Sequence, residues 1–198
     1  MGTSKDAIAN LVLAHLEVSR EISNLETEKS TEASLIRRHY PGSLEEVLGD
    51  YPWPEATRYR VLSLVANDPT DDWRYAYRYP NDCVHARRLV TGKGRDETDP
   101  PPWKTGSDEQ GLLIYANITP ATLEYTVLLT DPRLFSSTFV QALSWKIASL
   151  CTSLSKVSDI KKVCLQMYEL SVGRAETKAA NEQQQPKELD SEMIRSRG

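Results

Sequence analysis

Side chains able to do chemistry are present in this 198-residue sequence, but they are scattered along it. The histidines and cysteines fall at His15, His39, His85, Cys83, Cys151 and Cys164. They form no H-x-x-x-H, H-E-x-x-H or C-x-x-C spacing, and metal sites need ligands held close together. We therefore expect no metal, no cofactor and no catalytic residues. The odd number of cysteines favours reduced thiols in a cytosolic product.

An alternation of aromatic with other residues over 73–79, Trp-Arg-Tyr-Ala-Tyr-Arg-Tyr, is the most distinctive local pattern. A period of two predicts a β-strand with one aromatic face. The tyrosines of such a face could stack on sugars or bases while the arginines meet phosphates. Alternatively, the face packs on helices and the arginines point outward. We favour packing, because a strand with one apolar face usually buries it.

Composition limits the remaining function classes. Hydrophobic residues make up 39% of the chain, which is enough for a real core, and no stretch approaches the roughly 18 apolar residues of a membrane span. The N-terminus does not resemble a signal peptide, so we expect the chain to work where it is made. The net charge is −4 and the basic residues are dispersed, which argues against tight nucleic-acid binding.

The pattern along the chain predicts helices, then strands, then helices again. Helices are expected over about 5–20 and from Ser30 or Thr31 to about Gly49, with a kink or break at Pro41–Gly42. Strands are expected over 57–66, 73–79, 84–90, 112–116 and 122–129, and a long loop over 91–111. Two further helices follow, the first capped by Thr130 or Asp131, before a polar, loosely ordered tail.

The predicted fold is therefore α+β and mainly α: a bundle of about four helices with an inserted antiparallel β region and an extended C-terminal tail. Residues 1–56 supply the N-terminal helices, 57–130 the β insertion with loop 91–111, 131–182 the C-terminal helices, and 183–198 the tail.

The segment Trp73 to Cys83 resembles the W-x-Y-x-Y-x-x-P-x-D-C segment of tail tubular protein A, the head-to-tail adaptor or gatekeeper family of short-tailed phages. Further landmarks follow in that family's order: the helix ending near Pro52–Trp53, the Asp131 to Phe135 turn and the F-x-x-A-L start of the next helix. The residues that match these motifs are Trp53, Trp73, Tyr75, Tyr77, Pro80, Asp82, Cys83, Asp131, Phe135 and Phe139.

The resemblance implies a structural virion protein at the head–tail junction, made in the host cytoplasm. Twelve copies would form a ring between the portal protein and a tail nozzle of the tail tubular protein B kind. DNA would pass through the ring without specific binding, and no membrane would be involved. An acidic balance suits such a channel, because clustered lysines would hold the phosphates. The alternative is a soluble carbohydrate-binding tail component that uses strand 73–79.

The C-terminal tail carries a small set of residues suited to binding a partner. Leu189, Met193 and Ile194 return as apolar anchors in an otherwise polar stretch, with Arg195 and Arg197 beside them. Three apolar residues cannot offset the entropy of ordering a lone tail, but they could dock in a groove. We expect this segment to engage the portal or a neighbouring subunit.

Overall fold

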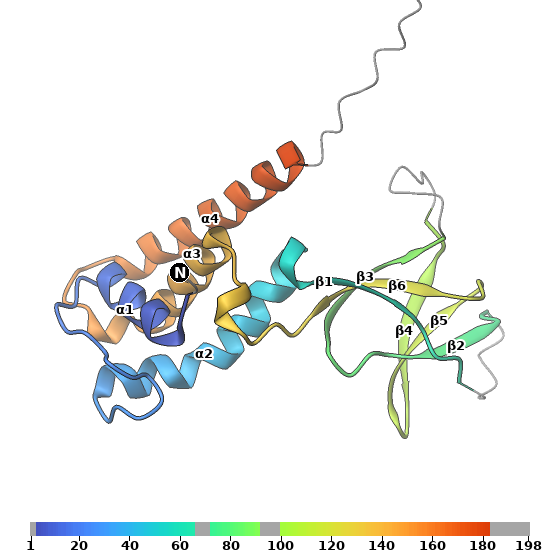
Figure 1. The fold of residues 1–198 in the computed structure, drawn as a ribbon, viewed down its shortest axis with the longest axis horizontal. Helices are drawn as coiled ribbons and strands as arrows, with labels where there is room; N and C mark the ends of the chain where they lie inside the picture. The colour runs from blue at the N-terminus through green and yellow to red at the C-terminus, as the bar shows by residue number, and fades with distance from the viewer. Residues whose placement is uncertain (1–2, 66–71, 92–99, 183–198) are drawn as a thin grey trace, which may run out of the picture.

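The computed structural model describes residues 3–65, 72–91 and 100–182, and in these ranges the protein is a mixed α+β structure (Figure 1). Helices α1 (Lys5–His15) and α2 (Thr31–Asp50) precede the strands, and α3 (Ser137–Leu150) and α4 (Ile160–Glu182) follow them. The strands are β1 (Thr57–Val61), β2 (Tyr75–Arg78), β3 (Cys83–Val90), β4 (Trp103–Asp108), β5 (Gly111–Ala116) and β6 (Thr122–Val127). Short 3₁₀ turns are η1 (Pro54–Ala56), η2 (Pro132–Leu134) and η3 (Thr152–Leu154).

Serine side chains cap the first three helices. Ser4, Ser30 and Ser136 each accept a hydrogen bond from the backbone N–H three residues later, which satisfies one of the donors left free at a helix start. The predicted cap at Ser30 is confirmed. The predicted cap of the third helix is wrong, because Asp131 caps only the η2 turn and α3 begins after Ser136.

The described helices bury their apolar faces in one cluster. Helix α3 has contacts with α1, α2 and α4. Fully buried residues come from each helix, among them Ile8, Ile36, Phe139 and Cys164. Because each large apolar side chain gains about 1.5–3 kcal/mol from burial, this cluster holds the helices together.

Helix α2 runs without interruption through Pro41, so the predicted break at Pro41–Gly42 is wrong. The proline side chain is exposed, and its missing N–H leaves one helical hydrogen bond unmade. Buried residues on both sides, Ile36 and Leu44 among them, keep the two halves on the same core. Their burial offsets a proline cost of about 3 kcal/mol. Helix α1, in turn, ends at His15 rather than near residue 20.

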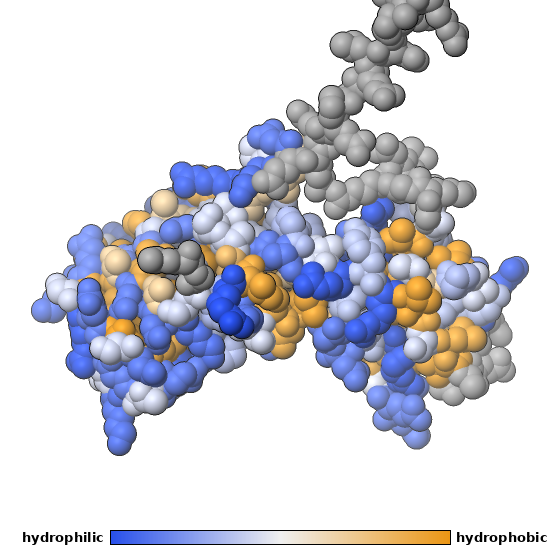
Figure 2. Space-filling model, in the orientation of Figure 1, coloured by the Kyte–Doolittle hydropathy of each residue, from blue (hydrophilic) through white to orange (hydrophobic). Residues whose placement is uncertain are grey.

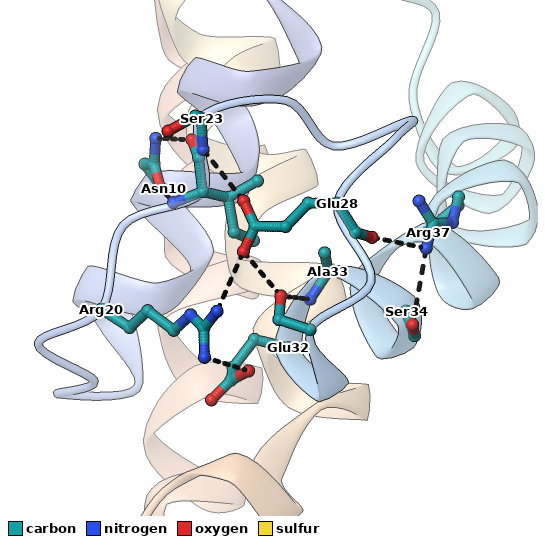
Figure 3. Close-up of polar contacts among 10 residues, drawn as sticks. Asn10, Arg20, Ser23, Glu28, Glu32, Ala33, Ser34 and Arg37 are labelled. Atoms are coloured by element: carbon teal, nitrogen blue, oxygen red, sulfur yellow. Dashed lines mark hydrogen bonds and ion pairs between the residues drawn. The ribbon is translucent and has the colours of Figure 1, made fainter.

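Residues 16–30 form neither helix nor strand, yet Ile22 and Leu25 are only 2% and 1% exposed. Side chains from the flanking helices fix this segment (Figure 3). The Asn10 carboxamide accepts from the Ile22 N–H at 2.7 Å and donates to its carbonyl at 2.9 Å. Arg37 donates to the Leu25 carbonyl, and Glu28 accepts from a hydroxyl, a backbone N–H and a guanidinium.

The strands form two antiparallel three-stranded sheets, ordered β1-β6-β3 and β2-β5-β4. Residues from both sheets share a second buried cluster, which includes Leu89, Leu123 and Tyr125 from the first sheet and Tyr77 and Ile114 from the second. The aromatic strand is therefore buried, as expected, but its partner is the other sheet. The prediction that it packs on the helices is wrong, because two facing sheets bury each other's apolar sides.

The predicted loop 91–111 contains a strand, β4, which pairs with β5 along its whole length. Gly106, which favoured a loop assignment, lies against the Tyr115 ring, and a Cβ at this position would come 2.3 Å from Cε2 of that ring. The glycine thus serves close packing within a sheet rather than a turn. Residues 92–99 of that predicted loop lie outside the described residues. So does the predicted tail 183–198, with Leu189, Met193, Ile194, Arg195 and Arg197.

Candidate interaction surfaces

The aromatic residues of the helical part form a packed group rather than a binding site. The buried Trp53 indole donates to the Val47 carbonyl at 2.7 Å and meets the Phe139 ring edge-on, 4.9 Å between centroids. Phe135 lies 4.7 Å from Phe139 by the same measure. Asp131 is half-buried on the preceding turn and pairs with Arg133 at 2.7 Å. These contacts fix where the chain returns from the sheets to the helices.

The aromatic strand offers less to a ligand than its sequence indicates. Tyr77 is 2% exposed, and its hydroxyl donates to the Ile118 carbonyl at 2.6 Å. Tyr75, the first residue of β2, and Trp73, two residues before it, are half-buried. Because the central ring is covered and its hydroxyl is satisfied, the strand does not present a row of stacking platforms.

The turn between β2 and β3 is held by its own polar groups. Pro80 is buried, and the Asp82 carboxylate accepts from the Tyr125 hydroxyl at 3.3 Å and pairs with Arg60 at 3.3 Å. Burial is the largest cause that raises the pKa of the adjacent Cys83 thiol. A raised pKa keeps that thiol protonated, which is the opposite of what a reactive cysteine needs.

A guanidinium joins the helical part to the sheets. Arg87 of β3 donates to the backbone oxygens of Leu48 and Gly49 at 3.1 and 2.9 Å, and to the Thr126 hydroxyl at 3.0 Å. The carbonyls belong to the last turn of α2, where a helix lacks partners of its own. On the returning segment, the Glu55 carboxylate accepts from the Ser136 N–H at 3.0 Å. Hydrogen bonds therefore hold both segments that connect the helical part to the sheets. The sequence pattern did not indicate that Arg87 and Glu55 have this role.

A polar cluster links α2, α3 and α4 beside this joint. The Tyr168 hydroxyl donates to Asp50 at 2.5 Å, and Lys146 pairs with Glu46 while its ammonium lies 5.2 Å from the Tyr168 ring centroid. Burial, followed by the hydrogen bond to Asp50, raises the pKa of Tyr168. Since a raised pKa keeps the phenol neutral, this group is a structural donor.

His15 is the histidine with the closest aromatic contact, and it stacks on Trp145 with 3.4 Å between ring centroids. Its Nε2 lies 3.0 Å from the Ser144 hydroxyl. That hydroxyl donates to the Gln141 carbonyl at 2.9 Å, so it accepts from the histidine N–H and is not activated by it. Burial lowers the pKa of His15 to about 4. The group therefore packs as a neutral ring.

Neither a metal-binding cluster nor a membrane-spanning helix is found where the structure is described. Over residues 3–65, 72–91 and 100–182, no three histidine, cysteine or acidic side chains come together as a metal site. No helix in these ranges is long and apolar enough to cross a membrane.

Exposed apolar side chains gather on both parts of the molecule, as Figure 2 shows from one side. In the β part, Tyr59, Val61 and Leu64 are 56%, 63% and 60% exposed. In the helical part, Val163 and Leu170 on α4 are 45% and 54% exposed. We call these the β1 surface and the α4 surface. Surface apolar residues are common singly, but grouped ones mark sites of interaction.

A hollow of about 260 Å³ adjoins the α4 surface. Its walls come from the first half of α3 and the middle of α4: Ser137, Thr138, Gln141, Trp145, Met167, Ser171 and Arg174. The lining combines the apolar side chains of Trp145 and Met167 with polar groups and the charged Arg174, a composition that suits the side chain of a partner protein.

In comparisons with known proteins, no family model and no curated protein matches this chain.

Proposed function

We propose that this protein is a structural virion component, a head-to-tail adaptor whose ring joins the portal to the tail nozzle and forms part of the DNA ejection channel. In this proposal α1 to α4 are the adaptor's helical bundle and the two sheets are its insertion. The tail 183–198 engages the portal or a neighbouring subunit through Leu189, Met193, Ile194, Arg195 and Arg197. The protein has no catalytic role.

The presence of two separate apolar surfaces on one chain carries the proposal. A ring subunit must contact a neighbour on each side as well as the components above and below it. The β1 surface and the α4 surface lie on different parts of the chain, so each can serve a different neighbour. The hydrogen bonds of Arg87 to the end of α2 support the proposal, because a ring that transmits force needs subunits of fixed shape.

Charge also fits a DNA channel without specific binding. Several arginines of the β part are already paired within the chain: Arg60 with Asp82, Arg78 with Asp108 and Arg88 with Glu124. Paired guanidiniums hold phosphates less strongly than free ones, because their charge is balanced locally. DNA would therefore meet little sustained attraction from these groups.

The experiment is to mix the purified chain with assembled portal rings of the same phage and to measure mass and image the complex. We expect twelve copies on one end of each portal ring. A chain that stays separate from portal at every concentration tested contradicts the adaptor function. A chain that instead binds a glycan panel through Trp73 or Tyr75 supports the carbohydrate-binding alternative.

A further inference from the structure

Helix α4 exposes a continuous face that nothing in the described ranges covers. Its inward residues, Cys164, Tyr168, Ser171, Ala175 and Ala179, are buried against the other helices. The opposite side carries Val163 and Leu170, both exposed, and Figure 1 shows the C-terminal half of α4 running past the end of α3. An apolar face on a projecting helix is a surface for another helix.

Two opposite charges border this face. Glu169 and Arg174 are both exposed, and neither has an ion-pair partner in the part of the chain that the structure describes. Five residues of α-helix turn the direction of a side chain by about 140°, so the two lie on opposite flanks of the Leu170 face. Arg174 lies on the flank next to α3, at the rim of the hollow.

The spacing of these charges specifies the direction of a partner helix. When two helices run parallel and in register, a residue on one flank meets the partner residue five positions later on the facing flank, which is the relation between g and e positions of a coiled coil. Glu169 and Arg174 have this spacing. A second copy of α4 therefore offers the opposite charge at the matching height, which an unrelated helix would do only by chance.

We propose that α4 of one copy packs parallel to α4 of a second copy, with the two Leu170 side chains facing each other and with Glu169 of each copy paired to Arg174 of the other. The inference goes beyond the proposed function and does not rest on it. Both copies use the same face, bordered by the same two charges, so the contact is isologous. Such a contact joins two copies and stops there.

Charge reversal tests the pairing directly. Glu169→Lys and Arg174→Glu should each weaken self-association at least tenfold in sedimentation velocity at high protein concentration, because like charges then face each other. An equimolar mixture of the two variants, and the double variant E169K/R174E, should restore association. Glu45→Lys, an exposed reversal on α2, is the matched control and should change nothing. Unaltered association in the single variants, or no recovery in the mixture, overturns the proposal, as does a wild-type chain that stays monomeric throughout.

A second measurement tests the two-fold geometry. The double variant E169C/R174C should yield, on oxidation, a cross-linked dimer and no larger species, whereas E169C alone should not cross-link. A ladder of trimers and larger species overturns the isologous contact. Attachment to portal separates the two levels of inference. If a portal-bound ring forms and is insensitive to charge reversal, the α4 contact is wrong and the adaptor function stands. If the chain associates through α4 but ignores portal, the adaptor function is wrong.

Discussion

The guanidinium of Arg87 donates a hydrogen bond to the backbone oxygen of Gly49 at 2.9 Å, across the boundary between the sheets and the helices. Gly49 belongs to the last turn of α2, and Arg87 lies in β3. One side chain thus satisfies a helix C-terminus and fixes the orientation of the β part relative to it. A hydrogen bond from a charged group contributes more than a neutral one, about 1.5–3 kcal/mol.

Arg87→Met should lower the free energy of unfolding by about 2 kcal/mol, because the helix-end carbonyls and Thr126 lose their donor. Chemical denaturation of the variant measures this loss, and hydrogen exchange should quicken in residues 48–53. Arg74→Ala is the control, since that side chain is exposed, and it should stay within about 0.5 kcal/mol of the wild type. Equal stability of the Arg87 and Arg74 variants would show that the joint is held elsewhere.

Tyr77 is the largest fully buried side chain of the second sheet. Tyr77→Ala should cost about 3–5 kcal/mol, and Tyr77→Phe about 1 kcal/mol for the lost bond to Ile118. Tyr59→Ala is the matched control, because Tyr59 is 56% exposed, and it should have little effect on thermal unfolding. If Tyr77→Ala kept its stability but lost binding to a glycan or nucleic acid, the ring would be a ligand platform instead of core.

How far the sequence predicts this structure depends on the range of the interactions. Local patterns located α1, α2, α3 and α4 and five of the six strands, because capping serines and apolar periodicity act within a few residues. Strand β4 was missed although it forms a tight hairpin with β5, in which Asp108 pairs with Gly111, because Gly106 reads as a turn until Tyr115 is placed beside it. Pro41 likewise signals a break that only tertiary burial overrides.

The interaction surfaces were harder still to predict. The Leu170 face of α4 can be recognised only from the structure, which shows that the helix buries one side and exposes the other. Arg87 carries no signal at all, because its partners are backbone oxygens 38 and 39 residues away in sequence. The burial of the aromatic strand was predictable from its period, but the element that covers it was not.

Acidification should destabilise the protein before its carboxylates titrate. Burial lowers the pKa of His15 from 6.5 to about 4. As the pH falls through 6.5 the unfolded chain takes up a proton that the folded chain refuses until about pH 4, so stability falls across that window. The part of the slope that comes from His15 should be less than about 1.4 kcal/mol per pH unit, the limit for one proton. Burial also lowers the pKa of His85, so the wild type alone does not isolate His15.

His15→Phe isolates the contribution of that ring. The phenyl group keeps the stacking on Trp145 but has no proton to gain. The unfolding free energy of the wild type should therefore fall relative to that of the variant as the pH drops from 6.5 to about 4. Denaturant titrations at several pH values measure this. Parallel pH profiles for the two proteins would mean that His15 is not the group that titrates.

Deletion of residues 183–198 should leave the melting temperature almost unchanged and abolish attachment to portal. Leu189, Met193 and Ile194 are spaced as anchors for a groove on another protein, and Arg195 and Arg197 can make rim contacts that set orientation more than affinity. The described ranges already assemble buried clusters from residues up to Ala179, and we therefore expect little loss of stability on deletion. Thermal unfolding and co-sedimentation with portal measure the two effects.

The variant L189A/M193A/I194A, which keeps the length and charge of the segment, should reproduce the binding loss. A truncated chain that still assembles on portal with normal affinity would assign portal binding to another surface, with the β1 surface as the next to mutate.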